Sequence, residues 1–186
     1  MGMDINGLKP KEHVKKSEFK TLSYYEDKSW RQRQDELNAD QELHDKYWDE
    51  WNEYRAVNKG VYFRNACARW RGLWDFCYFV GRLKGSEFDK ERDLPTDLIS
   101  KELWHEGHHN SGAGLDQISS IKLADLLQRA ADKGILSHYA EQWEQTVNVD
   151  ENGYLPPKEK WFYEFDTDNV FRFIKFLREC GGFEIC

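Results

Sequence analysis

The sequence predicts an α+β fold in which a small sheet of N- and C-terminal strands is packed by helices, with an inserted charged helical arm. Short strand patterns stand at both ends of the chain, in residues 1–10 and 183–186. Between them, apolar residues recur at the three- and four-residue steps typical of buried helix faces. The length of 186 residues is close to one ordinary domain, so we expect a single domain over residues 1–186.

The composition indicates a folded interior beneath a heavily charged surface. Charged residues make up 33% of the chain and apolar residues 39%, but the apolar part includes 8 Trp, 9 Tyr and 11 Phe. Because each aromatic ring can bury about 150–250 Å², a core is expected and disorder of the whole chain is not. The net charge of -7 disfavours broad nucleic-acid binding, which needs Lys and Arg to neutralise phosphates.

The sequence also predicts the compartment. No stretch approaches the roughly 18 consecutive apolar residues of a membrane span, and residues 1–16 lack the apolar region of a secretory signal. The four cysteines form no CxxC pair, and two of them lie in an apolar segment, so reduced thiols are expected. We therefore expect a cytoplasmic protein without a membrane partner.

The first third of the chain predicts one strand and then a charged helical appendage. Residues 1–10 read as a strand with Met3 and Ile5 on one face, followed by a basic segment at 9–20. Residues 28–58 carry apolar residues at near-helical intervals, which favours one long helix or a helical pair broken near Asn38, ending at Gly60. We expect residues 11–59 to form an inserted acidic appendage, whose charged face is either simply solvated or a surface for docking a partner or mimicking DNA.

The middle of the chain predicts the central helix. Residues 61–83 form the most apolar stretch, and its large residues recur at helical steps, at Phe63, Cys67, Trp70, Trp74 and Cys77. A charged linker at 89–96 and a short helix at 97–104 follow. The glycines at 107, 112 and 114 then make a long helix improbable.

The last third predicts helices followed by the closing strand. A helix at 120–133 is capped by Ser119 or Ser120 and stopped by Gly134, and a second helical piece spans 137–145. A loop at 147–160 precedes an aromatic strand at 161–166. A helix capped by Asp168 then turns at two glycines into the terminal strand.

Four blocks of the sequence carry a family resemblance. They are MGMDINGLKP at 1–10, GVYFRNACARWRGLW at 60–74, GHHNSGAGL at 107–115 and DNVFRFIKFLRECGGFEIC at 168–186. Together they resemble an uncharacterised family of small phage and bacterial proteins, over roughly a third of the chain. The chain departs from the family pattern in its charged stretch at 11–58 and in Gly72, where the family often has proline. The resemblance implies organisation and no established activity.

One candidate site combines the glycine-rich loop with basic and aromatic residues. Backbone amides near glycines, at the start of a helix, can hold an anion such as a phosphate. Arg64, Arg71 and Arg82 would share one face if all three lay on the predicted helix at 61–83, and aromatic residues near them, including Trp74, could stack on a base. The candidate ligand-binding residues are Tyr62, Arg64, Trp70, Arg71, His108, Asn110, Gly112 and Gly114. The alternative is that these glycines only shape a tight connection and the arginines pair with surface acids.

A second candidate site is an HExxH match. His105 and His109 could bind one Zn²⁺ from a helix while Glu106 acts as general base on a metal-bound water. Gly107 lies between the two ligands and no third ligand is evident, so zinc is a lesser expectation. Without it, no cofactor is expected.

The preferred function is therefore binding without catalysis. No GxSxG, GxxxxGK[ST] or GxGxxG pattern marks another active site. We expect a cytoplasmic protein of a phage or mobile element that engages a partner protein, such as a host protein, through its arm and aromatic surface. The alternatives are binding of a small anion or nucleotide at the glycine-rich loop, and a zinc-dependent hydrolase.

Overall fold

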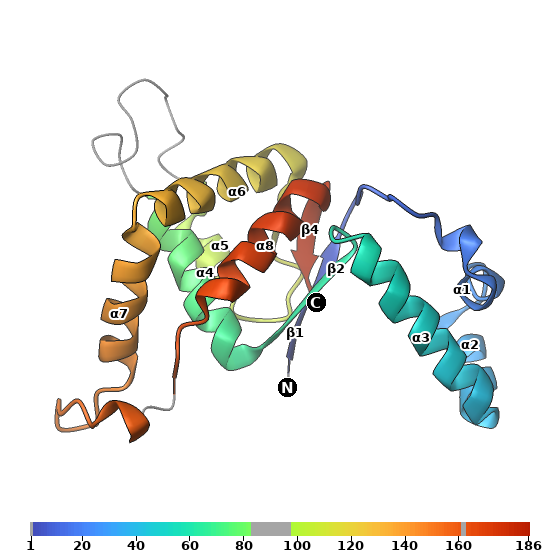
Figure 1. The fold of residues 1–186 in the computed structure, drawn as a ribbon, viewed down its shortest axis with the longest axis horizontal. Coiled ribbons are helices and arrows are strands. Elements are labelled where there is room, and N and C mark those ends of the chain that lie inside the picture. The colour runs from blue at the N-terminus through green and yellow to red at the C-terminus, as the bar shows by residue number, and fades with distance from the viewer. Residues whose placement is uncertain (1, 83–97, 161–162) are drawn as a thin grey trace.

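A four-stranded antiparallel sheet joins both ends of the chain and confirms the α+β class. The computed structural model describes residues 2–82, 98–160 and 163–186 (Figure 1). The strands are β1 Gly2–Gly7, β2 Tyr62–Ala66, β3 Gly114–Asp116 and β4 Gly182–Ile185, in the order β2-β1-β4-β3. In the centre, Ile5 pairs with Phe63 on one side and with Ile185 on the other. The predicted pairing of terminal strands is confirmed, and β2 and β3 extend the sheet on both sides.

Helices make up most of the remaining described chain. The α-helices are α1 Lys20–Tyr24, α2 Trp30–Ala39, α3 Gln41–Val57, α4 Cys67–Val80, α5 Lys101–Glu106, α6 Gln117–Asp132, α7 Ile135–Val147 and α8 Thr167–Glu179, and short 3-10 turns occur at η1 Lys16–Glu18 and η2 Lys158–Lys160. Side chains cap several N-termini by accepting a backbone N–H, as Asp116 does for α6 and Asp166 for α8. The caps predicted at Ser119 or Ser120 and at Asp168 are therefore wrong by a few residues. Within the described ranges, no helix combines the length and apolar character that crossing a bilayer requires.

The main core lies where α4, α6 and α8 pack on the sheet. Trp70 and Trp74 of α4 are fully buried and stack with ring centroids 5.4 Å apart. Their indole N–H groups donate to the backbone carbonyls of Gly107 and Trp104, at 2.7 and 2.9 Å. Burial of two indoles with their polar atoms satisfied makes α4 the central helix of the domain.

Residues 11–59, which we call the arm, enter between β1 and β2 and project to one side of the sheet (Figure 1). The arm has its own buried cluster, separate from the main core, formed by Leu22, Tyr25, Leu37, Tyr47 and Tyr54. The expected helical pair is present, with the break at Asp40, which caps α3. At the base, the Gly7 N–H donates to the Val61 carbonyl at 3.1 Å, so the chain leaves and re-enters the sheet at one place.

Two predicted elements are wrong. Residues 62–66 of the predicted central helix form β2, and the helix begins only at Cys67. Residues 163–166 of the predicted aromatic strand have no strand partner and lead irregularly into α8, while 161–162 and the linker at 89–96 lie outside the described residues. Helix α3 ends three residues before Gly60. Position 60 needs glycine for a different reason, because a Cβ on it would lie 2.2 Å from the Glu179 carbonyl oxygen.

Asn58 ties the base of the arm together and provides a test. Its fully buried side chain accepts from the N–H groups of His13 and Val14, at 2.6 and 3.2 Å, and donates to the Val14 carbonyl at 2.9 Å. Asn58→Ala removes these bonds and leaves backbone groups unpaired, so it should destabilise the arm by about 2–4 kcal/mol. Chymotrypsin cleavage within the arm should accelerate more than about tenfold.

The matched control is Asn38→Ala, at an exposed position of α2, which should leave the cleavage rate near that of the native protein. Equal acceleration of cleavage in arm and main core would contradict the local role given to Asn58.

Candidate functional site

The structure separates the sequence-predicted ligand residues into two groups. Tyr62 and Arg64 lie on β2, whereas Trp70 and Arg71 lie on α4. His108, Asn110 and Gly112 follow α5, and Gly114 begins β3. The expected arginine face is wrong, because Arg64 belongs to a strand and Arg82 lies beyond the end of α4.

The glycines of the loop serve close approaches within the fold. A Cβ at Gly107 would lie 2.3 Å from the Trp74 indole nitrogen, and one at Gly114 would lie 1.8 Å from the Phe183 carbonyl oxygen. Gly112 has a φ of +81°, and its N–H donates to the Ile185 carbonyl at 2.8 Å. These contacts favour the structural interpretation of the glycine pattern.

The aromatic and basic parts of the nucleotide hypothesis do not come together as expected. Trp70 and Trp74 are fully buried, so stacking of a base on either indole is wrong. Arg71, His108 and Asn110 do line a common cavity of about 400 Å³. Among the residues that the structure describes, Arg71 is the one Lys or Arg side chain on that cavity.

His108 is engaged with a partly buried carboxylate. Its Nε2 lies 3.2 Å from Oδ1 of Asp75. The same oxygen accepts from the Trp104 indole at 2.8 Å, and Oδ2 accepts from the Trp143 indole at 3.2 Å. Burial alone would raise the pKa of the Asp75 carboxyl, but the hydrogen bonds from His108, Trp104 and Trp143 hold its pKa below the ordinary 3.8. This cluster ties α4, α5 and α7 together.

The HExxH residues do not lie on one continuous helix. Helix α5 ends at Glu106, Gly107 is its C-cap, and His109 follows outside it. The rings of His105 and His109 have centroids 5.9 Å apart. In the parts of the chain that the structure describes, no three His, Cys, Asp or Glu side chains gather as metal ligands.

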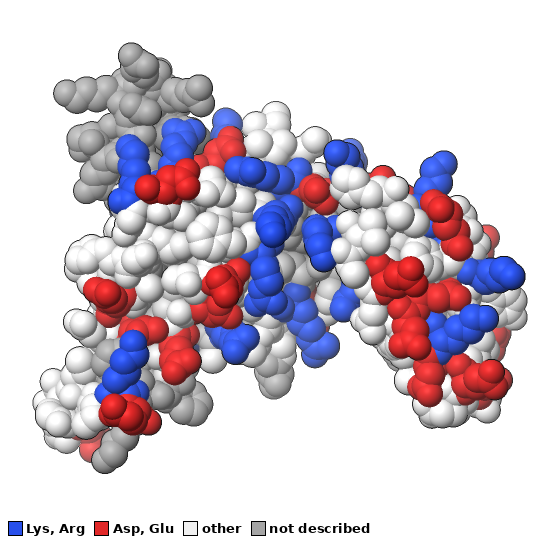
Figure 2. Space-filling view, in the orientation of Figure 1, with Lys and Arg blue, Asp and Glu red and all other residues white. Residues whose placement is uncertain are grey.

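A different site, which we call the basic groove, lies where α3, β2 and α8 meet. It is a cavity of about 470 Å³ lined by Asn52, Arg55, Ala56, Lys59, Tyr62, Phe63, Arg64, Arg172, Lys175 and Phe176. Half of these residues are Lys or Arg and none is Asp or Glu, although the chain carries a net charge of -7. Figure 2 shows a concentration of Lys and Arg at this junction, with acidic side chains over the arm beside it.

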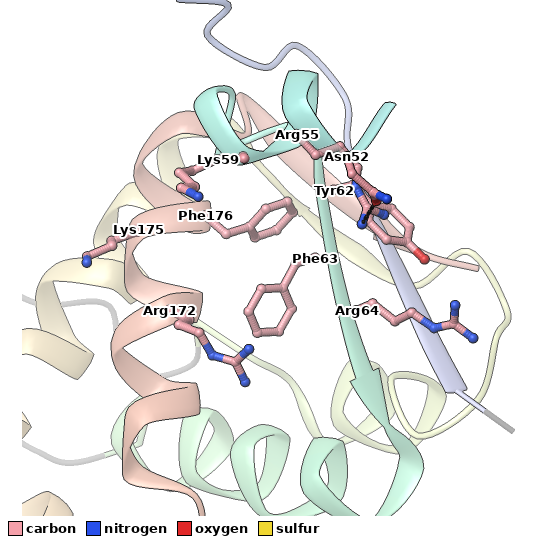
Figure 3. A pocket seen from close by; sticks show the side chains of 10 residues that line it. Asn52, Arg55, Lys59, Tyr62, Phe63, Arg64, Arg172, Lys175 and Phe176 are labelled. Atoms are coloured by element: carbon pink, nitrogen blue, oxygen red, sulfur yellow. Dashed lines mark hydrogen bonds between the residues drawn. The ribbon is translucent and has the colours of Figure 1, made fainter. Parts of the chain in front are cut away.

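Aromatic rings form the inner surface of the groove. Phe63 of β2 and Phe176 of α8 are buried, with ring centroids 5.6 Å apart, and Figure 3 shows both rings between strand and helix. Next to them, the Arg55 guanidinium lies 4.5 Å from the centroid of the Tyr62 ring. The Tyr62 hydroxyl donates to Asp4, and burial together with that carboxylate raises its pKa to about 12. Tyr62 is therefore a fixed, neutral phenol.

The cations of the groove are only partly compensated. Arg64, whose side chain is 67% exposed, lies 3.6 Å from Asp4, and Arg172 lies 3.9 Å from Asp166. Lys59 and Lys175 are exposed and make no ion pair with any residue that the structure describes. Like charges around one cavity repel each other, so a bound anion would be stabilised there.

Sequence reasoning found two of the groove residues, Tyr62 and Arg64, and missed those supplied by the arm and α8. The one signal for α8 is that Arg172 and Lys175 stand three residues apart, as neighbours on one helix face. Their meeting with Arg55 and Lys59 depends on tertiary structure.

The Asp75 cluster provides a prediction of pH dependence. Because folding lowers the pKa of Asp75, its ionised carboxylate stabilises the fold at pH values above the ordinary carboxyl pKa. This stabilisation is lost as the pH falls through the lowered pKa. Asp75→Asn should lower the free energy of unfolding by about 2 kcal/mol at pH 6. The deficit should shrink as the pH falls below the ordinary carboxyl pKa, as measured by urea denaturation at pH 6 and in acid.

Asp125→Asn, at a half-exposed carboxylate 3.6 Å from Arg178, is the control and should cost less than about 1 kcal/mol. A deficit for Asp75→Asn that stays constant as the pH falls would contradict the stabilising carboxylate.

No protein-family model matches the chain. Searches of curated proteins and of solved structures return no match either. The family resemblance described above therefore stays a prediction, and functional conclusions depend on the basic groove itself.

Proposed function

We propose that this is a non-catalytic binding protein that takes an acidic segment of a partner protein into the basic groove. The observation that carries the proposal is a cavity whose described lining has five Lys and Arg side chains and no carboxylate, in a chain with a net charge of -7. Such a local field attracts acidic groups and accelerates their association. The groove thus offers a specific anionic contact that the average charge of the chain would not suggest.

The character of the lining favours a peptide over a free phosphate. The half-buried Tyr62 and the exposed Ala56 lie among the cations, so a ligand that also carries apolar groups would use more of the surface. Arginine side chains can also grip a carboxylate with two parallel hydrogen bonds. A peptide with acidic and apolar side chains fits both features.

The surroundings of the groove disfavour a long nucleic acid. Acidic side chains cover much of the neighbouring arm in the view of Figure 2. A duplex crossing the groove would carry phosphates across that acidic surface, where they would be repelled. A short segment that ends within the groove avoids this cost.

We propose further that the protein acts in the cytoplasm on a host protein. The four cysteines are free thiols, and Cys77 and Cys180 are buried, which agrees with a reducing compartment. The host partner follows from the resemblance to small phage and bacterial proteins.

The test is selection from a random dodecapeptide library, followed by fluorescence anisotropy with the enriched peptides. We expect acidic peptides to be enriched. The double variant Lys59→Glu/Lys175→Glu should weaken their binding at least about tenfold, equivalent to about 1.4 kcal/mol. These two lysines suit the test because they are exposed and unpaired within the described chain, so reversing their charge should leave the fold intact.

The matched control, Lys46→Glu/Lys122→Glu, makes the same change in net charge at exposed positions of α3 and α6. Equal weakening by both double variants would reduce the effect to overall charge and contradict the groove. Enrichment of peptides without acidic residues would contradict the proposal directly. Competition by pyrophosphate or by a thymidine dodecamer at concentrations below the peptide Kd would instead favour a phosphate ligand.

A further inference from the structure

We infer that the acidic segment binds as an extended strand that pairs with the free edge of β2 and becomes a fifth strand of the sheet. This inference rests on the proposed function and adds the conformation of the ligand. β2 is the last strand of the sheet on its side, since β1 is its one strand neighbour in the described chain. An unpaired strand edge presents a row of N–H and C=O groups that can template a further strand.

The hydrogen-bond parity of the sheet identifies which groups are free. Asp4 exchanges backbone hydrogen bonds with Cys186, at 2.7 and 3.4 Å, so Asp4 points its backbone groups toward β4. The alternate residues of β1, among them Ile5, therefore point their backbone groups toward β2. Ile5 pairs there with Phe63. On β2 itself, the intervening residues Tyr62 and Arg64 must direct their N–H and C=O groups away from β1.

Those free groups face the basic groove. Tyr62 and Arg64 both line the cavity, and Figure 3 shows the cavity between β2 and α8, on the side of β2 away from β1. No backbone hydrogen bond from the described residues reaches the N–H or C=O of Tyr62 or Arg64 outside the sheet. The polar edge, the cations and the phenylalanine rings thus belong to one surface.

The two faces of β2 define the side chains that the added strand would carry. Phe63 is buried on one face, while Tyr62 and Arg64 lie on the other. Side chains of a paired strand alternate in the same way, so one set would lie on the face that carries Phe63 and the other would meet Arg64 and Arg55. An alternation of acidic and apolar residues over about five positions, the length of β2, fits this arrangement.

The test uses the peptide acetyl-(Glu-Val)4-amide as probe and amide hydrogen exchange measured by NMR on the full chain. In the free protein, the amides of Tyr62 and Arg64 should exchange much faster than those of Phe63 and Asn65, which face β1. With the peptide bound, exchange at Tyr62 and Arg64 should slow at least about tenfold. Exchange at Phe63 and Asn65 should change little. The peptide acetyl-(Lys-Val)4-amide is the charge control and should not bind.

Two backbone-methylated forms of the probe separate strand pairing from charge attraction. One carries N-methyl groups on every Glu amide and the other on every Val amide, so both keep all four carboxylates. In a paired strand, alternate amides face β2 while the others face away, and one methylated peptide should lose binding while the other retains it.

The outcomes distinguish the two proposals. Absence of any perturbation of groove amides at millimolar acidic peptide would overturn the proposed function and the strand addition with it. Perturbation of the groove without slowed exchange at Tyr62 and Arg64, together with equal binding of both methylated peptides, would overturn the strand addition alone.

Discussion

The pairing of β1 with strands from both distant parts of the chain is the constraint on which the rest of the structure depends. Ile5 is fully buried and pairs with Phe63 and Ile185. This pairing brings the start of the arm next to its end, since both flank the β1–β2 connection. It also brings α8, which leads into β4, alongside β2. The basic groove exists because these three segments converge at one edge of the sheet.

The arm contributes to the groove as well as projecting from the sheet. Its last helical turn supplies Arg55 and the segment beyond supplies Lys59, while acidic residues outnumber basic ones along α3 as a whole. Asn58 holds that end of the arm against the chain at Val14, which limits how far the cations can move. The groove thus receives two cations from an appendage whose longest helix carries more acidic than basic residues.

Much of the fold follows from local pattern, and what does not follow depends on distant contacts. Met3 and Ile5 alternate as a strand should, and the apolar spacing of residues 117–132 suits only a helix. Phe63 stands four residues before Cys67, and that spacing fits a helix equally well, so the five-residue strand β2 was hidden. The glycines at 107–114 do mark places where other groups approach the backbone closely. The approaching groups, however, are Trp74 and Phe183 rather than a ligand. Tyr62 and Arg64 were found as site residues, but their neighbours Arg172 and Lys175 come from a remote helix.

The same cations account for how an open strand edge can persist without self-association. Exposed edges tend to pair with edges of other copies, and charged residues are a common defence against this. If β2 of one copy approached β2 of another, the cations around Arg64 and Lys59 would face their equivalents and repel them. An acidic strand is attracted instead, because the cations that repel a second copy are opposite in charge to its carboxylates. The same cations therefore keep a second copy away from the edge of β2 and attract an acidic strand to it. The free backbone groups of β2 can then pair with that acidic strand.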